Sequence, residues 1–251
     1  MCLIVFAWQV IPGIPLIAAA NRDEYYARAT APASAWPEHP HIYAGRDLKA
    51  GGSWMGITQS DSGGVSSRFA AITNIRNPAE HRDDAPSRGH LVADYLAGGM
   101  SAQDYVAAIS AGSDDYNGFN LVLGDRDTLI WYSNKGRHDP RNGQPLAPGI
   151  YGLSNALLDA PWPKVLKTKA QFASLLCLGA PEDAYFEMLA DTAPAPDQRL
   201  PDTGVPLDLE RVLSAVRIET PGYGTRTSTV VKLSPRFSVN VLTFESTAVI
   251  S

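Results

Sequence analysis

The sequence predicts an α+β fold in which two sheets carry helices on their outer faces. Strand-like runs come first, helical patterns occupy the middle, and strand-like runs close the chain. This order differs from the β-α-β alternation that is typical of a parallel sheet. A length of 251 residues suits one large layered domain, and no repeat or linker divides the chain. We therefore predict a single domain over residues 1–251.

The chain opens with two apolar runs. Residues 2–10 are rich in Val, Ile, Phe and Trp, and residues 16–20 form the second run. Residues 11–15, with two prolines and a glycine, have the chemistry of a turn. Together these segments predict a β-hairpin. Its return strand brings residues 21–24 back beside Cys2.

The remaining elements follow from periodicity and from turn residues. Residues 25–50 contain Pro32, Pro37 and Pro40 and are expected to form a loop. Further strands are expected at 53–58, 69–73, 119–123, 128–132, 150–154, 225–233 and 238–244, with a turn at 61–64. Helices are expected after the caps Ser87 and Ser101 and over 161–177, 181–189 and 207–214. Cys177 is expected on the buried face of its helix.

Composition limits the classes of function. A net charge of −5 and a pI of about 5.5 argue against nucleic-acid binding through a basic surface. The two cysteines, Cys2 and Cys177, form neither a disulfide framework nor a zinc spacing, and we expect no metal site. The apolar N-terminus lacks a basic segment and is interrupted by Gln9 and two prolines, so it predicts neither a signal peptide nor a membrane span. We expect a cytoplasmic protein.

Cys2 is the strongest candidate for chemistry. It follows Met1, and its small side chain should let an aminopeptidase remove that residue. An α-amine titrates at about 7.7–8.0 and a Cys thiol at about 8.5, so the freed residue would carry its own general base. Arg22 is expected to lower the thiol pKa. The alternative is that Cys2 is a small core residue and that residues 22–24 are a solvated strand end.

Two polar side chains follow predicted strands, and a third lies at the start of one. Asn74 and Asn155 each come where an apolar strand ends. An amide there can donate to a developing oxyanion, an effect of about 2.7–4 kcal/mol, although Asn also commonly begins a turn. Arg226 enters the last strand pair, where it could hold a substrate carboxylate or form an ordinary ion pair.

Several sequence blocks resemble one known family, the NRDE or transport-and-Golgi-organisation-two family. The resemblance covers almost the whole length. The blocks are Asn21-Arg22-Asp23-Glu24, Gly51-Gly52-Ser53-Trp54-Met55-Gly56, Ser87-Arg88-Gly89-His90-Leu91, Tyr151-Gly152-Leu153-Ser154-Asn155 and Tyr223-Gly224-Thr225-Arg226-Thr227-Ser228-Thr229. One small departure is Ser53, where the family pattern has Thr.

The family is similar to N-terminal-nucleophile (Ntn) hydrolases of the choloylglycine-hydrolase-like branch. This resemblance implies a four-layer αββα sandwich with Cys2 as the nucleophile. It implies catalytic roles for Arg22 and Asp23, with Glu24 as the other residue that could orient the amine. The remaining implied site residues are Asn74 and Asn155 at the oxyanion site and Glu24, Trp54 and Arg226 in substrate binding.

Two functions are expected from these residues. The first is an N-terminal-cysteine hydrolase or acyltransferase that acts on a small amide or thioester and requires no cofactor. The alternative is a haem or acyl-lipid carrier, in line with the haem-trafficking, lipid and secretory biology associated with the family. Its apolar cleft would be lined by Trp8, Trp36, Trp54 or Phe119, with haem as a carried ligand. A third class, an interaction protein without a small ligand, has no specific sequence feature, and the oligomeric state stays open.

Overall fold

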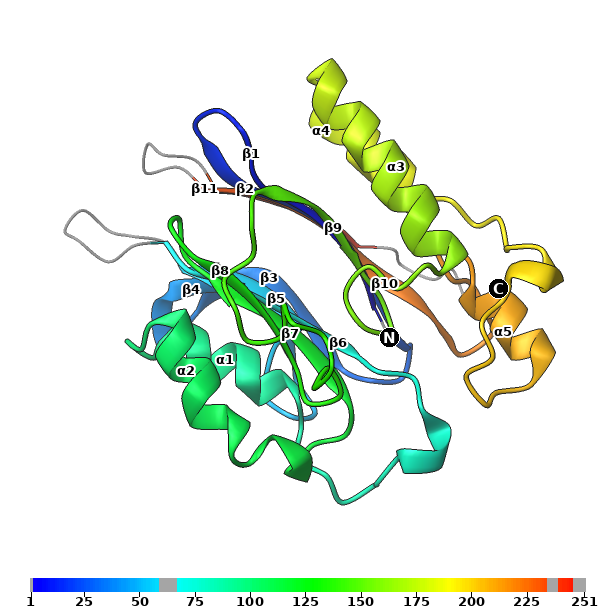
Figure 1. Ribbon diagram of the computed structural model, residues 1–251, viewed down its shortest axis with the longest axis horizontal. Coiled ribbons are helices and arrows are strands. Elements are labelled where there is room, and N and C mark those ends of the chain that lie inside the picture. The colour runs from blue at the N-terminus through cyan, green and yellow to red at the C-terminus, as the bar shows by residue number, and fades with distance from the viewer. Residues whose placement is uncertain (1, 59–66, 234–238, 246–251) are drawn as a thin grey trace.

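The computed structural model describes residues 2–58, 67–233 and 239–245. Met1 and the turn expected at 61–64 lie outside these ranges. Within these ranges, two antiparallel sheets and five α-helices confirm the expected α+β class (Figure 1). Among the described residues, no helix combines the length and the apolar character that a membrane crossing requires.

The two sheets differ in size. The first has the order β11 (Val239–Glu245), β10 (Tyr223–Leu233), β2 (Ile14–Tyr25), β1 (Cys2–Ile11) and β9 (Gly149–Leu153). The second has the order β3 (Thr30–Trp36), β4 (His39–Asp47), β5 (Met55–Thr58), β6 (Phe69–Asn74), β7 (Phe119–Gly124) and β8 (Leu129–Ser133). The helices are α1 (Gly89–Ala97), α2 (Ala102–Ser110), α3 (Pro163–Leu178), α4 (Glu182–Leu189) and α5 (Leu207–Leu213).

Three apolar clusters fix the order of the layers. One lies between the two sheets and includes Phe6 and Trp131. A second joins the six-stranded sheet to α1 and α2, and a third joins the five-stranded sheet to α3 and α4. Figure 1 shows the two helix pairs on opposite outer faces of the paired sheets. Each sheet is therefore buried on both faces, which explains the nearly continuous apolar runs of the central strands.

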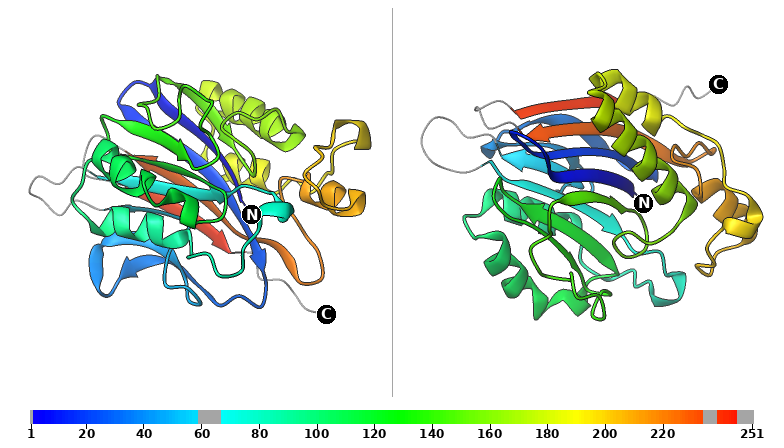
Figure 2. Two further views of the ribbon diagram at one scale, coloured as in Figure 1. Left: turned by 60° about the horizontal axis from the view of Figure 1, so that its bottom comes forward. Right: turned by 45° about the horizontal axis from the view of Figure 1, so that its top comes forward.

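The predicted N-terminal hairpin is confirmed and lies inside its sheet. β1 pairs with β2 on one side and with β9 on the other (Figure 2, dark blue). Side chains alternate along a strand, so Ile4 faces the other sheet while Leu3 faces α3 and α4. The pairing sets Cys2 directly opposite Arg22 at the end of the hairpin.

The loop expected over residues 25–50 is wrong, because that segment forms β3 and β4. β3 is the edge strand of its sheet. Pro32 lies where the β3–β4 register shifts, and Pro40 lies beside the second shift in the same pair. Proline is tolerated at edges and bulges, since no ladder hydrogen bond is required there.

Two smaller expectations about helices also fail. Cys177 is exposed, because it lies one position beyond Leu176 and so points away from the core that Leu176 enters. Ser87 does not cap α1, since Arg88 holds the cap position without a side-chain bond. The Ser101 cap of α2 is confirmed by a 3.1 Å bond from the Asp104 backbone N–H to Ser101 Oγ.

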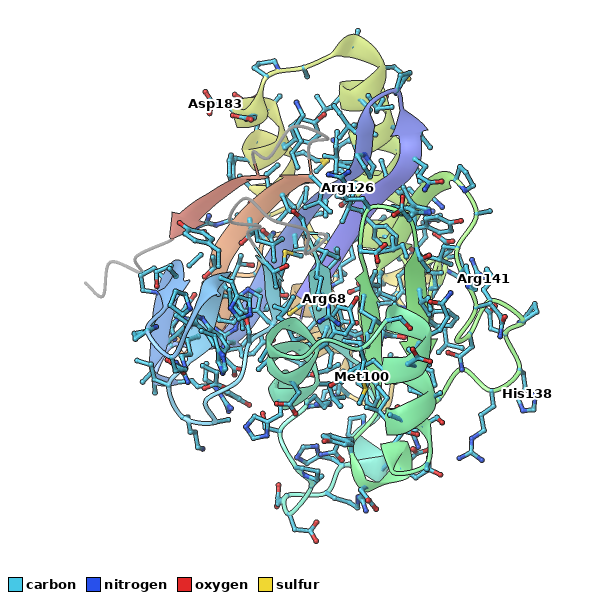
Figure 3. All side chains as sticks on the ribbon, turned by 90° about the vertical axis from the view of Figure 1, so that its left-hand side faces the viewer. Arg68, Met100, Arg126, His138, Arg141 and Asp183 are labelled. Carbon is cyan, nitrogen blue, oxygen red and sulfur yellow. The ribbon has the colours of Figure 1, made fainter. Side chains whose placement is uncertain are left out.

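One arginine ties α1 to the six-stranded sheet. Arg68, just before β6, lies with its guanidinium 3.8 Å from the centroid of the Tyr95 ring on α1. Its guanidinium also donates to the carbonyl oxygens of Gly98 and Met100 at the end of that helix (Figure 3). This contact holds the helix whose first turn borders the candidate site.

Candidate functional site

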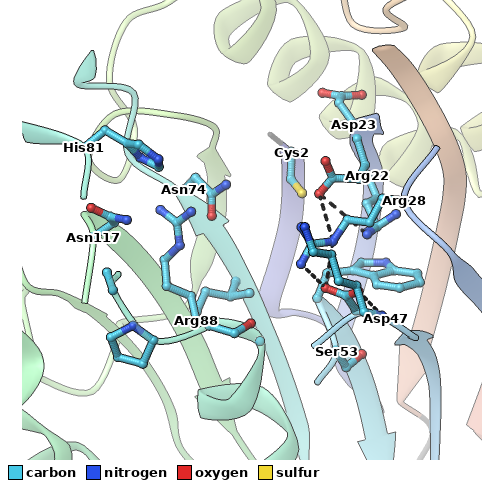
Figure 4. A pocket seen from close by; sticks show the side chains of 18 of the residues that line it. Cys2, Arg22, Asp23, Arg28, Asp47, Ser53, Asn74, His81, Arg88 and Asn117 are labelled. Atoms are coloured by element: carbon cyan, nitrogen blue, oxygen red, sulfur yellow. Dashed lines mark hydrogen bonds and ion pairs between the residues drawn. The ribbon is translucent and has the colours of Figure 1, made fainter. Parts of the chain in front are cut away.

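A cavity of about 380 Å³ opens where β1 and α1 begin and where β2 and β6 end. Figure 4 shows its side chains. Six of the predicted site residues line it: Cys2, Arg22, Asp23, Glu24, Trp54 and Asn74. The other lining residues are Arg28, Asp47, Lys49, Ser53, Ile72, His81, Arg82, Asp83, Ala85, Pro86, Ser87, Arg88, Gly89 and Asn117. The structure therefore brings most of the sequence-predicted residues together.

The thiol of Cys2 lies at the inner wall of this cavity. Directly opposite residues of an antiparallel pair point to the same face, so Cys2 and Arg22 lie side by side. Burial raises the pKa of the Cys2 thiol, while the Arg22 guanidinium and the backbone N–H of Asp23 act in the opposite direction. The expected lowering by Arg22 is present, but the net direction is upward because the side chain is only 9% exposed.

 Arg22 stacks on the side chain of Trp54. Its guanidinium carbon lies 4.3 Å from the centroid of the Trp54 ring. The same ring also rests on Gly45, where an added Cβ would lie 2.2 Å from the indole. Arg22 also approaches Glu24 at 3.7 Å and donates to Thr30 Oγ1 at 3.3 Å. The lack of a side chain at Gly45 thus lets Trp54 fix the cation beside the thiol.

Arg28 and Asp47 complete this wall of the cavity, and sequence reasoning missed both. Arg28 Nε and Nη2 donate to Asp47 Oδ2 at 2.9 and 2.6 Å. Asp47 Oδ1 accepts from the backbone N–H groups of Lys49 and Ala50, and Glu24 lies 3.8 Å from Arg28. Arg22 and Arg28 therefore each have a carboxylate partner. The sequence feature that could have indicated Asp47 is the polar segment Gly45-Arg46-Asp47.

Asp23 lies on the opposite face of β2. Thr225 Oγ1 donates to Asp23 Oδ1 at 2.6 Å, and the carboxyl is 1% exposed. Burial raises the pKa of Asp23, against the positive charge of Lys164. Glu24 shares the face of Cys2, whereas Asp23 approaches the same strand end from the α3 side. Both positions border the backbone end of Cys2, so both remain candidates to orient a freed α-amine.

The two predicted asparagines have different surroundings. Asn74 lines the cavity at the end of β6, and its side-chain amide forms no hydrogen bond with another described residue. Asn155 is 1% exposed and does not line the cavity. Its Nδ2 donates to the Asn74 carbonyl oxygen at 2.9 Å, while Ser154 Oγ donates to the Cys2 carbonyl oxygen at 3.0 Å. Asn155 therefore holds the strand ends together behind the site.

Arg226 and three of the four expected aromatic residues lie outside the cavity lining. Arg226 Nη1 donates to three backbone carbonyls in the segment after β2, including that of Arg28 at 2.5 Å. Trp8, Trp36 and Phe119 are buried in the cores. The structure thus places Arg226 as a brace for the loop rather than at the cavity surface, and the cavity wall is mainly polar.

Arg88 is the main cavity residue that sequence reasoning missed. It precedes α1, lines the cavity, and donates from Nη1 to the Gly118 carbonyl oxygen at 2.9 Å. The only sequence feature that pointed to Arg88 was its place in the block Ser87-Arg88-Gly89-His90-Leu91, which resembles the family pattern. No group of three or more His, Cys, Asp or Glu side chains is arranged to hold a metal within the described ranges. His138 lies on an outer loop (Figure 3) and His81 at the cavity rim.

This arrangement can support attack on a carbonyl group. Cys2 is a buried thiol beside a cation, and the Asn74 amide, which bonds no other described side chain or backbone group, is a donor in the same cavity. A nucleophile and an oxyanion donor that face one space are the minimum equipment for acyl transfer.

Comparison with known proteins gives a family for the whole chain. The family model described as Transport and Golgi organisation 2 matches residues 1–248. A Bos taurus protein named "Transport and Golgi organization protein 2 homolog" is 36% identical, and its Homo sapiens counterpart is 34% identical. Each match covers 92% of this chain and 88% of the relative. A Drosophila melanogaster relative is 31% identical over 92% of this chain and 87% of its own length. The chain belongs to the Transport and Golgi organisation 2 family.

Proposed function

We propose that this protein is an N-terminal-cysteine hydrolase or acyltransferase that acts on a small amide or thioester. One observation carries the proposal. The Cys2 thiol lies beside Arg22 and shares a cavity with the Asn74 amide, which forms no hydrogen bond with another described residue. The order of helices, two packed sheets and helices supports assignment to the αββα sandwich of Ntn hydrolases. The cavity volume of about 380 Å³ suits a small substrate.

The chemistry begins with removal of Met1, which gives Cys2 a free α-amine. That amine takes the thiol proton, and Sγ forms a bond to the substrate carbonyl carbon. The carbonyl π electrons move to oxygen, and Asn74 Nδ2 donates a hydrogen bond to the oxyanion. Either Asp23 or Glu24 orients the amine.

Collapse of the oxyanion breaks the bond to the leaving nitrogen or sulfur, which takes the proton from the α-ammonium group. The acyl group then remains on Cys2 as a thioester. Water or an acceptor amine attacks this thioester while the α-amine removes its proton. The products are a carboxylic acid or a new amide, and the Cys2 thiol is restored.

The direction of the pKa shift of Cys2 predicts how the rate depends on pH. Burial raises the pKa of the thiol, so proton transfer to the amine is incomplete near neutral pH. We expect the single-turnover rate to rise with pH until the α-amine is mostly neutral, above about 8. A rate that falls from pH 6 to 8 would contradict the amine as general base.

The direct test is acylation of the protein with its N-terminus defined by mass. Protein whose first residue is Cys2 is incubated with a panel of small amides and thioesters, and the N-terminal peptide is analysed for an acyl adduct. The Cys177→Ser background removes the exposed thiol, so an adduct is assigned to Cys2. Protein with one residue inserted before Cys2 is the matched control.

Three results decide the proposal. An adduct that needs a free N-terminal Cys2 and turns over supports it. We expect Cys2→Ala to abolish turnover and Asn74→Ala to lower it by about 10²–10³-fold, the usual cost of one oxyanion donor. Full turnover in Cys2→Ala, or no adduct across the panel, counts against an enzymatic role and returns attention to the haem or acyl-lipid carrier.

A further inference from the structure

Arg88 differs from Arg22 and Arg28, the two arginines of the opposite cavity wall, in forming no ion pair with another described residue. Arg22 lies 3.7 Å from Glu24, and Arg28 lies 2.6 Å from Asp47. Within the described residues, Arg88 forms no ion pair, and its one hydrogen bond goes to the Gly118 carbonyl oxygen. The guanidinium therefore keeps most of its N–H donors available to the cavity.

The backbone around Arg88 is packed closely against neighbouring segments of the chain. A Cβ added to Gly52 would lie 2.4 Å from the Gly89 carbonyl carbon. The Ser53 backbone N–H donates to the Gly89 carbonyl oxygen at 3.1 Å. At the other end of the side chain, the Gly118 carbonyl oxygen that accepts from Arg88 also accepts from the Ile75 backbone N–H at 2.9 Å. Both the base and the tip of Arg88 are thus fixed to the six-stranded sheet.

The position of the guanidinium relates it to the reacting groups. Figure 4 shows the Arg88 side chain reaching Asn74 on the left of the view, with Cys2 on the other side of Asn74. The neighbouring polar groups are already engaged: Asn117 binds the backbone of Arg82 through both its oxygen and its nitrogen. Asn74 and Arg88 are therefore two side chains of this wall with polar groups available to a bound molecule.

The charge of the lining indicates what kind of group would fit. Five Lys and Arg residues and four Asp and Glu residues line the cavity, which leaves a net charge of +1 with His neutral. Burial lowers the pKa of Arg88, which is the mark of a cation that has lost part of its hydration. A planar guanidinium with free donors matches a carboxylate by two parallel hydrogen bonds. One uncompensated positive charge matches a monoanion better than a phosphate dianion.

We propose that Arg88 binds the carboxylate of the substrate, and that the substrate is a small amide carrying one such group. This inference rests on the proposed acyl transfer for the placement of the amide carbonyl between Cys2 and Asn74. Arg88 then fixes the far end of the same molecule. It acts as a specificity-determining residue and takes no part in bond making or breaking.

The test measures binding, which does not depend on turnover. Calorimetric titration compares N-acetylglycine with its neutral counterpart N-acetylglycinamide on the wild-type protein. We expect the carboxylate to bind at least tenfold more tightly, a difference of about 1.4 kcal/mol. Arg88→Gln should remove this preference, and Arg88→Lys should keep part of it because the charge remains.

The control is Arg82→Gln. Arg82 lines the same cavity, but its guanidinium donates to the backbone carbonyls of Asp114 and Asp115. The preference for the carboxylate should survive this change. Thermal unfolding of each variant checks that the fold is intact, and the Lys variant keeps the comparison valid if Arg88→Gln does not fold.

Several outcomes overturn the proposal. They are equal binding of the two probes, binding of neither, a preference unchanged in Arg88→Gln, or tighter binding of inorganic phosphate than of either probe. The two proposals fail separately. An Arg88-dependent preference without any Cys2 adduct would remove the acyl-transfer function alone, whereas Cys2-dependent turnover without the preference would remove the carboxylate site alone.

Discussion

Two groups of charged side chains flank the same end of β1 and β2, one open to the cavity and one sealed under α3 and α5. The cavity network consists of Arg22, Glu24, Arg28 and Asp47. The buried network consists of Asp23, Lys164, Arg76 and Glu210. Side chains alternate along β2. Arg22 therefore points to the cavity network, and the neighbouring Asp23 points to the buried network.

The difference lies in exposure to water. The Arg76 and Glu210 side chains are 5% and 4% exposed, whereas Arg28 and Asp47 are 27% and 13% exposed. Removing one member of a sealed pair leaves a charge that water cannot reach, while an open pair is replaced by hydration. The buried network should therefore govern stability, and the cavity network should govern the shape and charge of the site.

The largest effect is expected at Arg76. Its Nη1 donates to Glu210 Oε2 at 2.6 Å, so Arg76→Met leaves a buried carboxylate without this partner. We expect the free energy of unfolding to fall by about 3–5 kcal/mol, measured by urea denaturation. The control Lys135→Met breaks an exposed pair with Glu80 and should cost about 0–1 kcal/mol. Equal losses in the two variants would erase the distinction between the networks.

Lys164 provides a pH test of the buried network. Burial lowers its pKa to about 8 from an ordinary 10.5, although the nearby Asp23 opposes the shift. Between these two pH values the unfolded chain binds more protons, so this group makes the protein more stable as the pH rises. Relative to Lys164→Met, the unfolding free energy of the wild type should increase by up to about 3 kcal/mol from pH 8 to 10.5.

Denaturant titrations of both proteins at matched pH values give that difference. Tyrosines and exposed lysines titrate in both proteins and therefore cancel. A difference that stays flat over this range would mean that Lys164 is not held as a desolvated cation in the folded protein.

Gly52 tests whether backbone packing also holds the wall that carries Arg88. A Cβ at this position would meet the Gly89 carbonyl carbon and oxygen at 2.4 and 2.6 Å. Because backbone atoms cannot move aside cheaply, we expect Gly52→Ala to cost about 1–3 kcal/mol. Gly99→Ala meets no atom within 4 Å and is the control. Thermal unfolding of the two variants should separate them clearly, and matching melting temperatures would contradict the close contact.

Local signals in the sequence predicted much of the scaffold. The turn residues at 11–15 and the two apolar runs gave the hairpin, and the hairpin gave the Cys2–Arg22 pair. Asn74 was found because an apolar strand ends there. These inferences succeed because each depends on residues that are near neighbours in the chain.

Other features depend on contacts between distant segments. In the sequence alone, Pro32 and Pro40 are typical of a loop. Only the pairing with distant segments makes β3 an edge strand and places bulges in the β3–β4 ladder. The partner of Asn155 is a backbone carbonyl 81 residues away, which no local pattern reveals. Arg88 enters the cavity because Gly52 and Gly89 pack together. Side-chain contacts of this kind form only when the layers of the fold pack together.

The smallest effect on stability is expected in the cavity network. Arg28→Met removes two hydrogen bonds to Asp47, but water reaches both groups, and we expect a loss of about 1 kcal/mol at neutral pH. Burial alone would raise the pKa of Asp47, but the bonds and charge of Arg28 outweigh it and hold that pKa below its ordinary value of 3.8. The stabilisation is therefore present above pH 3.8 and is lost as the pH falls through the lower folded-state pKa.

Urea denaturation of wild type and Arg28→Met at pH 7 and at pH 3 measures this difference. It should be clear at pH 7 and should shrink at pH 3, which lies below the ordinary pKa of 3.8, because the unfolded chain is then mostly protonated at Asp47. Asp47→Asn provides the second arm, because it removes the charge and keeps the shape, and its loss relative to the wild type should likewise shrink from pH 7 to pH 3. If Arg28→Met instead costs as much as Arg76→Met, then the cavity wall is part of the structural core, and the division of the two networks by exposure to water is wrong.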